Sequence, residues 1–386
     1  MPDKFTTTTT TSYGSRITNS IKSVIAGLIL FVGSFAVLYW NEGQVDYSTI
    51  AQTATHISAE ATNTNAALNG QLVSATGIFD SQETIGDGLF LKPDKFIGAD
   101  RVVEMYAWTE KEESKSKTNV GGSETTETTY TYEKEWTDDP ENSSEFKYPE
   151  GHVNPQKTLK DSSDRAKTAT LGVYSVDMAS VELPDFESLE LTTGNTTLSQ
   201  GAVLASQDYL YIPKTKTSSF DIPEVGDLRV SYLVLRPGAK STIFGKLDGT
   251  SITAYNDKDN NLFYRVFSGT REEAISTLHS EYLISLWLFR ALGFVMMWLG
   301  LAMLFTPISV VLDVLPIFGT ISRMLIGGIA FIVSLILSLV TILVSSVIHN
   351  VVALVITLVI AAVLIVMAAL RLKKKKAAAI AVKPVV

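Results

Sequence analysis

The sequence of 386 residues contains no cysteine and only four histidines. Without cysteine there is no disulfide framework, no thiolate nucleophile and no zinc or iron–sulfur centre held by thiolates. The sequence also lacks a G-x-S-x-G elbow, an H-E-x-x-H helix, a P-loop and a dinucleotide-binding fingerprint. We therefore expect no catalytic residues, no bound cofactor, no metal site and no enzymatic activity.

Basic residues are scarce in the middle of the chain. Residues 41–282 hold 38 acidic and 21 basic residues, a net charge of −17, whereas the two flanks together hold 11 basic and 2 acidic residues. The acidic middle disfavours nucleic acid as a partner, because a phosphate backbone needs a basic surface. Basic flanks are typical of segments that membrane insertion leaves in the cytoplasm.

Apolar residues make up 46% of the chain and gather in long runs near its two ends. The first run predicts a transmembrane helix at 21–40, since about 20 residues cross the hydrocarbon core. No small-residue cleavage site follows this run, which favours an uncleaved anchor over a signal peptide. Later runs predict transmembrane helices at 283–306, 324–348 and 351–370, and a tight polar turn makes the last two a hairpin.

The basic residues beside these helices predict their orientation. Four crossings place both termini on the same side, and both termini are basic. We therefore expect a disordered cytoplasmic tail at 1–20, a cytoplasmic interfacial loop at 307–323 and a basic cytoplasmic tail at 371–386. Residues 41–282 would then be periplasmic or extracellular, or lumenal in a eukaryote, and the protein would be a multi-pass integral membrane protein.

The segment between the first two transmembrane helices, residues 41–282, predicts a β-rich domain. Short runs rich in aromatic and β-branched residues, often alternating with polar ones, indicate strands. These runs are 72–79, 102–108, 125–136, 227–235, 241–247 and 262–267. The polar stretch 115–124 is expected to be the loop of a long hairpin that brings the aromatic residues around Trp108 and Trp136 together. The fold class is an α+β membrane protein with one transmembrane helix before this domain and three after it.

Two short motifs add local detail. Thr270 and Glu273 have the spacing of a capping box, which predicts a helix from Arg271 that continues into the second transmembrane helix. Residues 257–261 begin like a calcium loop but lack the glycine and the glutamate required at positions six and twelve. We interpret this stretch as a hairpin turn.

Six short blocks along the chain together resemble the transmembrane protein 43 family, also called LUMA. The blocks are Asn41-Glu42-Gly43, Val103-Glu104-Met105-Tyr106-x-Trp108, Tyr130-x-Tyr132-x-x-x-Trp136, Gly151-His152-x-Asn154-Pro155, Pro223-Glu224-Val225-Gly226-Asp227-Leu228-Arg229-Val230-Ser231 and Arg290-Ala291-x-Gly293. They fall in the family's order and at comparable places relative to the transmembrane helices. The threonine-rich start and the lysine-rich finish depart from the family pattern.

The resemblance implies a four-helix membrane protein with a large lumenal domain. In animals the family is found in the endoplasmic reticulum and inner nuclear membrane, in complexes that include lamins and emerin. Bacterial relatives also exist, and this chain is more similar to those, so nuclear partners are not carried over. The family has no established enzymatic activity, and the resemblance therefore implies none.

Five residues are candidates for structural or coupling roles. Arg290 lies about 6 residues inside the second transmembrane helix, where a charge either snorkels to the head groups or forms a structural pair with the outer domain. His152, between glycine and proline neighbours, is either a turn histidine bonded to backbone or a base or ligand. Asp313 is the only charge in an apolar loop at 313–319, which either lies in the head-group layer or docks another protein. Trp108 and Trp136 belong to the aromatic face of the predicted hairpin.

These observations favour a non-enzymatic membrane scaffold that organises membrane lipids, other membrane proteins or copies of itself. The alternative is an envelope sensor, in which the outer domain binds a ligand and the helix from Arg271 couples it to the membrane. A membrane hydrolase is less favoured, because the usual nucleophile and base signatures are missing. Transport is least favoured, because Arg290 is the only charge well inside a transmembrane helix.

Overall fold

The computed structural model describes residues 3–60, 66–258 and 260–349, and these fall into two compact units. The sheet unit comprises residues up to 8, 46–115 and 127–280, and the helical unit comprises 9–45, 116–126 and the residues from 281 onward. The fourth transmembrane helix predicted at 351–370 and the basic tail predicted at 371–386 lie outside the described residues.

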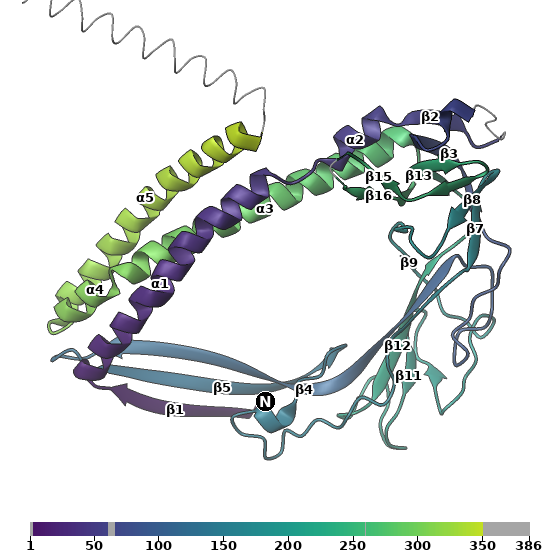
Figure 1. The fold of residues 1–386 in the computed structure, drawn as a ribbon. Helices are drawn as coiled ribbons and strands as arrows, with labels where there is room; N and C mark the ends of the chain where they lie inside the picture. The colour runs from purple at the N-terminus through teal and green to yellow at the C-terminus, as the bar shows by residue number, and fades with distance from the viewer. Residues whose placement is uncertain (1–2, 61–65, 259, 350–386) are drawn as a thin grey trace, which may run out of the picture. The chain divides into compact units, whose positions relative to one another are not determined.

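One sheet of the chain has eight strands, most of them antiparallel (Figure 1). Its order is β1 (Asp3–Thr11), β5 (Glu124–Thr137), β4 (Gly98–Thr118), β12 (Leu228–Leu235), β11 (Leu210–Ile212) and β10 (Val203–Leu204), with β6 (Ser162–Arg165) beside β4 and β9 (Glu187–Ser188) beside β12. In β12 every second residue is buried, because successive side chains of a strand point to opposite faces of the sheet. Its buried face contributes Tyr232 and Val234 to a core that also contains Phe90 and Phe96.

The second sheet closes on itself. Its order is β17 (Arg265–Ser268), β13 (Ala239–Asp248), β14 (Ser251–Thr253), β8 (Tyr174–Asp177), β7 (Thr168–Leu171), β3 (Leu72–Asp80) and β2 (Thr55–Ser58). Because β13 also pairs with β3, five of these strands form a small barrel. Its interior is filled by buried side chains such as Ile243, Leu247 and Tyr174. A short hairpin of β15 (Tyr255–Asn256) and β16 (Leu262–Phe263) accompanies it.

The predicted strands are present, with two differences in extent. The polar stretch expected to be a loop at 115–124 is mostly strand, because β4 continues to Thr118 and β5 begins at Glu124. Cross-strand hydroxyl pairs such as Ser116–Thr126, 2.8 Å apart, hold this ribbon without an apolar face. The run at 262–267 is interrupted at the buried Tyr264 and forms β16 and β17 separately.

The N-terminal tail expected to be disordered at 1–20 is ordered from Asp3 onward. Residues Asp3–Thr11 form β1 beside β5, and α1 begins at Tyr13. Threonine is β-branched and suits a strand, so a threonine tract next to an available sheet edge can pair with it. The side chains of Thr6 and Thr129 lie 3.3 Å apart across this pairing. The prediction of disorder was therefore wrong for these residues.

Among the residues that the structure describes, three helices are long and apolar enough to cross a membrane. They are α1 (Tyr13–Glu42), α3 (Arg271–Leu304) and α5 (Pro316–His349), and the shorter helices are α2 (Tyr47–Thr53) and α4 (Thr306–Leu312), with 3-10 turns at Ala66–Leu68 and Ser143–Glu145. The predicted spans 21–40 and 324–348 lie within α1 and α5. The span predicted at 283–306 agrees with α3 up to Leu304, and α4 occupies the start of the interfacial loop predicted at 307–323.

α3 begins with the predicted capping box and passes from one unit into the other. The backbone N–H of Thr270 donates to Glu273 Oε2 at 2.7 Å, and the N–H of Glu273 donates to Thr270 Oγ1 at 3.3 Å. The helix then runs without a break from Arg271, and its residues from Glu281 onward belong to the helical unit. The expected continuous helix is therefore present.

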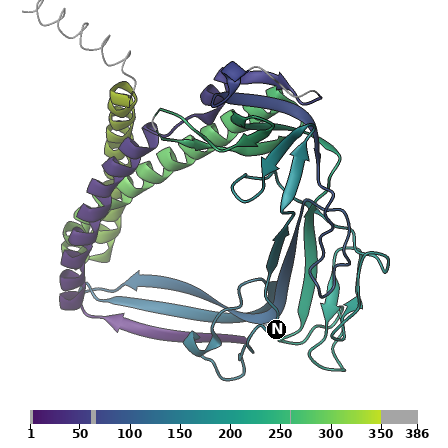
Figure 2. The same ribbon diagram turned by 45° about the vertical axis from the view of Figure 1, so that its right-hand side comes forward.

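Small residues allow α1 and α3 to approach closely, and the two helices lie side by side in Figures 1 and 2. A Cβ atom added to Gly27 would lie 2.8 Å from the carbonyl oxygen of Gly300, and one added to Gly300 would lie 2.6 Å from the backbone nitrogen of Phe31. On α5, Ser334 and Ser338 are buried. Packing within the chain therefore accounts for these small residues.

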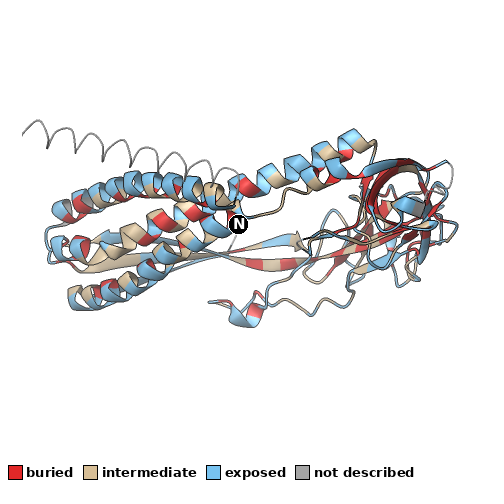
Figure 3. Ribbon diagram, turned by 45° about the horizontal axis from the view of Figure 1, so that its top comes forward, coloured by how far each residue is buried: buried red, intermediate tan, exposed pale blue. Residues whose placement is uncertain are grey.

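The apolar surfaces of the long helices are largely exposed. In the most apolar stretch of each helix, fewer than a quarter of the residues are buried. Figure 3 shows these helices mostly in the colour of exposed residues, whereas the strands of the sheet unit carry many buried residues. Exposed apolar faces of this extent are typical of helices that contact lipid or other helices.

Candidate functional site in the helical unit

A carboxylate near one end of the helical unit joins its three long helices. Arg290 of α3 donates Nε to Oε1 of Glu42 at 2.7 Å and Nη2 to Oε2 at 2.8 Å. Ser346 of α5 also donates to Oε2 of Glu42, at 2.7 Å. The side chain of Glu42 is only 3% exposed. Paired N–H···O bonds from one guanidinium are a strong, directional contact, so this Glu42 cluster fixes α1, α3 and α5 to one another.

Arg290 forms a structural pair, as one interpretation predicted, but its partner belongs to the helical unit and not to the sheet unit. Its guanidinium forms an ion pair and lies 4.9 Å from the centre of the Trp287 ring. The partner, Glu42, is the last residue of α1. Sequence reasoning noted Glu42 only as part of the Asn41-Glu42-Gly43 block and did not identify it as the partner.

Replacing Arg290 with leucine is expected to destabilise the helical unit by about 3 kcal/mol, because it leaves the Glu42 carboxylate buried without a counter-charge. Arg290→Lys is the matched control. It keeps the positive charge but not the bidentate geometry, so its loss of stability should be smaller. Thermal unfolding of the full chain in detergent measures both. Equal melting temperatures for Arg290→Leu and the unchanged protein would show that the pair contributes nothing.

A second carboxylate, Asp313, lies between two arginines at the other end of the helical unit. Arg16 Nη2 donates to Asp313 Oδ2 at 2.5 Å, and Arg323 Nη1 donates to both carboxylate oxygens at 2.6 Å. Arg16 also pairs with Glu124 at 3.0 Å. The Asp313 side chain has no exposed surface. A Cβ atom added to Gly319 would overlap Asp313 Oδ1, so glycine at that position leaves room for the carboxylate.

The burial of Asp313 bears on both interpretations of the loop at 313–319. Its carboxylate is fully buried in this Asp313 cluster and does not offer a charge to a docking protein. Among the loop side chains that the structure describes, apolar ones such as Leu315 and Phe318 are each more than half exposed. The sequence signal that was missed is the pair of arginines: Arg16 was used only as a marker of membrane sidedness, and Arg323 only as the end of the loop at 307–323.

The tip of the β4–β5 hairpin, residues 119–123, also contacts this cluster. Arg16 Nη1 donates to the carbonyl oxygen of Gly122 at 2.6 Å, and the N–H of Gly121 donates to the carbonyl oxygen of Val314 at 3.1 Å. The predicted topology places residues 41–282 on one side of the membrane, and Arg16 and the loop at 307–323 on the other. Atoms separated by a bilayer cannot make these contacts, so the structure differs from the predicted topology at the tip.

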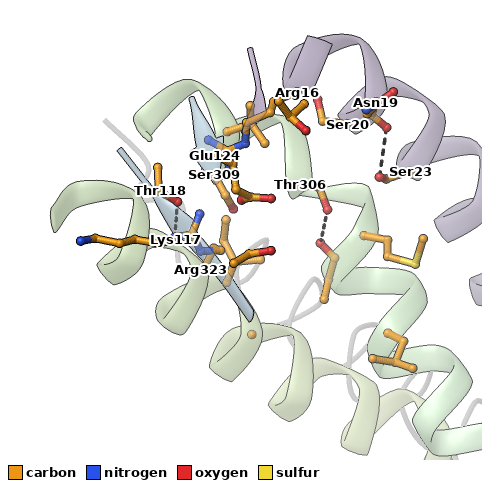
Figure 4. Close-up of a pocket in the computed structure, with 18 residues that line it drawn as sticks. Arg16, Asn19, Ser20, Ser23, Lys117, Thr118, Glu124, Thr306, Ser309 and Arg323 are labelled. Carbon is orange, nitrogen blue, oxygen red and sulfur yellow. Dashed lines mark hydrogen bonds and ion pairs between the residues drawn. The ribbon is translucent and has the colours of Figure 1, made fainter. Parts of the chain in front are cut away.

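A pocket of about 830 Å³ opens beside the Asp313 cluster. α1, the hairpin, α3, α4 and α5 all contribute to its lining. Arg16, Ser20, Glu124 and Arg323 give it a polar side (Figure 4). The other side is apolar and is formed mainly by Leu299, Ala302, Met303, Val310 and Ile326.

In the sheet unit, His152 lies in a cage of aromatic rings. Its ring stacks on Tyr132 with centroids 3.9 Å apart and meets Trp108 edge-on at 4.8 Å. Nδ1 lies 2.8 Å from the carbonyl oxygen of Tyr148, and Nε2 lies 3.0 Å from Asp3. Burial, together with a hydrogen bond to Glu110, raises the pKa of Tyr132 to about 12. His152 is 2% exposed, so these contacts favour a structural histidine over a solvent-facing base.

Trp136 lies in a separate group from Trp108, although both belong to the hairpin. Its ring centroid is 5.3 Å from that of Tyr106 on β4, as the predicted pairing of aromatic residues across the hairpin requires. The guanidinium of Arg229 lies over the same ring at 4.9 Å and forms an ion pair with Glu104. This arrangement stabilises the ladder between β4, β5 and β12.

Asp87 is a buried carboxylate that sequence reasoning did not identify. Its Oδ1 accepts the backbone N–H groups of residues 89–91 at 2.8–2.9 Å, and its Oδ2 accepts from Arg101 at 2.7 Å and from Tyr232 at 2.5 Å. Burial acts to raise the pKa of Asp87, but the hydrogen bonds from Tyr232, Leu89 and Arg101 outweigh it and hold the pKa below its ordinary value. This carboxylate connects the loop before β4 to β4 and β12.

The strands β15 and β16, which flank the acidic stretch that begins like a calcium loop, pair antiparallel as the predicted hairpin requires. Asn261 donates its backbone N–H and its side-chain amide to Asp257, both at 2.8 Å. Among the residues that the structure describes, no group of three histidine, cysteine, aspartate or glutamate side chains is placed to hold a metal ion.

Comparison with known proteins identifies the family. The family model described as Transmembrane protein 43 matches residues 105–351, which is more than half of the chain. The chain belongs to the transmembrane protein 43 family. The matched region contains β5, α3, α4 and most of the hairpin, together with Arg290, Asp313 and Arg323.

Individual members of the transmembrane protein 43 family are similar along most of their length. Transmembrane protein 43 of Homo sapiens is 25% identical over 353 residues, covering 86% of this chain and 85% of the human protein. The Mus musculus protein is 24% identical, covering 83% of this chain and 82% of its own. A Drosophila melanogaster homologue is 26% identical, covering 71% and 74%. No solved structure matches the chain significantly.

Proposed function

We propose that this member of the transmembrane protein 43 family is a non-enzymatic membrane scaffold that gathers membrane proteins, lipids or copies of itself. The observation that carries the proposal is the different placement of charged and apolar side chains in the helical unit. Charged side chains are used in the Glu42 and Asp313 clusters to hold the helices together, while the apolar faces of α1, α3 and α5 stay exposed. Such faces offer packing surface to lipid and to partner helices.

Native mass spectrometry of the protein released gently from its own membrane tests this role. A scaffold is expected to appear as a defined multimer, or together with recurring protein or lipid partners. A bare monomer without retained partners would contradict the proposal. The Arg290→Leu variant is the control for the fold of the helical unit. It should lose partners as well, because its helices are no longer held together by the Glu42 cluster.

The sensor is the second candidate, and α3 is the observation that favours it. Ala274 and Leu278 near its start are buried with Phe244 and Phe263 in the sheet unit, and the same helix continues past Glu281 in the helical unit. A ligand of the sheet unit would raise the melting temperature with the logarithm of its concentration. A screen that finds such a compound would favour the sensor over the scaffold.

We further propose that the hairpin tip shares the side of the membrane on which α1 begins. The basic residues Arg16 and Lys22 favour the cytosolic side for that end. The proposal concerns residues 116–126, which belong to the helical unit, and assigns no side to the sheet unit. This proposal replaces the assignment of residues 41–282, as one block, to the opposite side.

Single cysteines test the sidedness, because the chain has no thiol of its own. Val120→Cys, at a tip position that is 84% exposed, and Thr10→Cys in β1 are expected to react with a membrane-impermeant maleimide from the same side. Labelling from opposite sides would overturn the tip contacts and restore the predicted topology. Thr49→Cys on α2 reports in the same experiment whether α1 crosses the membrane.

A further inference from the structure

The pocket beside the Asp313 cluster combines features that suit an amphiphile. Its cationic side contains Arg16 and Arg323, and its apolar side contains Leu299, Met303 and Ile326. A volume of about 830 Å³ lies within the usual range of ligand pockets, about 300–1,000 Å³. A pocket of this size has room for a head group and the first methylenes of a chain, but not for a whole lipid.

The charges around the pocket leave an excess of one positive charge. Arg16, Arg323 and Lys117 are opposed by Glu124 and the buried Asp313. Arg323 donates from Nη1 to Asp313 and from Nη2 to Thr118. Its side chain is nevertheless 43% exposed, and a guanidinium carries five N–H donors. Donors therefore remain for an anionic group, and arginine is well suited to phosphate.

Lys117 supplies a second cation at the rim of the pocket. Its side chain is exposed, and it has no hydrogen-bond or ion-pair partner among the described parts of the chain. In Figure 4 its ammonium extends away from the other labelled side chains. A cation in this position attracts an anion from solvent, whereas Arg16 is buried and already paired.

The place of the pocket along the helices distinguishes a lipid from a soluble anion. Its polar side lies where α1 begins, at the ends of helices long and apolar enough to cross a membrane. Its apolar side continues along α3, where Leu299 is 47% exposed, and α5, where Leu325 is 58% exposed. A phosphate at Arg323 would thus leave its acyl chains against surfaces that are themselves apolar.

We propose that this pocket binds an anionic glycerophospholipid, with the head-group phosphate at Arg323 and Lys117 and the acyl chains along α3 and α5. The lipid fills space between the hairpin tip and the helices and so ties residues 116–126 to the membrane. This role does not depend on whether the protein also gathers partners as a scaffold.

The test uses the full chain in detergent, titrated with phosphatidylglycerol or phosphatidylcholine of identical acyl chains and followed by native mass spectrometry. Wild type is expected to retain phosphatidylglycerol in preference to phosphatidylcholine. Lys117→Gln should lower that preference about fivefold, which is the ratio for about 1 kcal/mol per basic residue near an anionic head group. Ala302→Phe, which fills the apolar side, should lower retention of both lipids.

Matched controls make the result decisive. Lys22→Gln removes an exposed positive charge from α1 outside the pocket and is expected to leave the preference unchanged. An equal loss in Lys22→Gln and Lys117→Gln would show diffuse charge attraction and overturn the site. Displacement of the lipid by inorganic phosphate at equal concentration would identify a soluble anion site instead. Equal retention of the two lipids by wild type would also overturn the proposal.

Discussion

Asp313→Asn is expected to destabilise the helical unit by about 3–5 kcal/mol, the usual cost of removing one partner from a buried ion pair. Asparagine keeps the shape of the side chain but removes the charge that Arg16 and Arg323 share. The Arg16 side chain is only 7% exposed, so its positive charge would remain buried with Glu124 as its main partner. Thermal unfolding of the full chain in detergent measures the loss.

Glu124→Gln is the control for Asp313→Asn, because it removes the other carboxylate that contacts Arg16. The Glu124 side chain is 30% exposed, so water can replace part of what is lost, and the effect should be about 1 kcal/mol or less. The double variant Asp313→Asn with Arg323→Gln should lose less than the sum of the two single changes, because the two residues interact directly. Equal losses for Asp313→Asn and Glu124→Gln would refute the central role of Asp313.

Asp87→Ala should have the largest effect in the sheet unit, again about 3–5 kcal/mol. The change removes the acceptor for Arg101 and Tyr232 and leaves three backbone N–H groups without their partner. Asp100→Asn is the matched control on β4, because its pair with Arg165 is about one-third exposed on both sides and should be worth about 1 kcal/mol or less.

The pH dependence of stability provides a second test of Asp87. Its pKa is lower in the folded protein than in the unfolded chain, so the ionised carboxylate stabilises the fold at pH values above its ordinary pKa of 3.8. That contribution is lost progressively as the pH falls from there through the lowered pKa. Asp87→Ala should therefore flatten the acid limb of the stability curve, and an unchanged acid limb would show that Asp87 does not contribute.

Local patterns in the sequence predicted much of the fold. The strands, the start of α3 and the helices around 21–40, 283–306 and 324–348 follow from alternation, capping and apolar length, which are local properties. The prediction of disorder failed for the threonine tract of β1, because no local pattern shows that the edge of β5 is available for pairing. Pairing with a distant partner decided that segment.

The candidate site was only partly predictable for the same reason. Arg290 and Asp313 stand out because a charge in an apolar segment needs a partner. The partners themselves, Glu42 for Arg290 and Arg16 for Asp313, lie 248 and 297 residues away along the chain. Glu124 was hidden in a polar stretch that was expected to be only a loop. The long-range pairing of hairpin and helix therefore needed the structure.

The strand β1 also has a consequence for how chains meet one another. It occupies the end of the eight-stranded sheet, and Phe5 stacks on Tyr148 at 4.6 Å over the aromatic residues of β5. A chain trimmed of its first dozen residues would present β5, rich in tyrosine and threonine, as an open template for a neighbouring molecule. With residues 3–11 in place, the edge of the sheet is instead β1, whose exposed side chains are mainly threonines, so the edge is more polar than β5 would be. A purification tag is therefore safer at a position that leaves residues 3–11 free to pair.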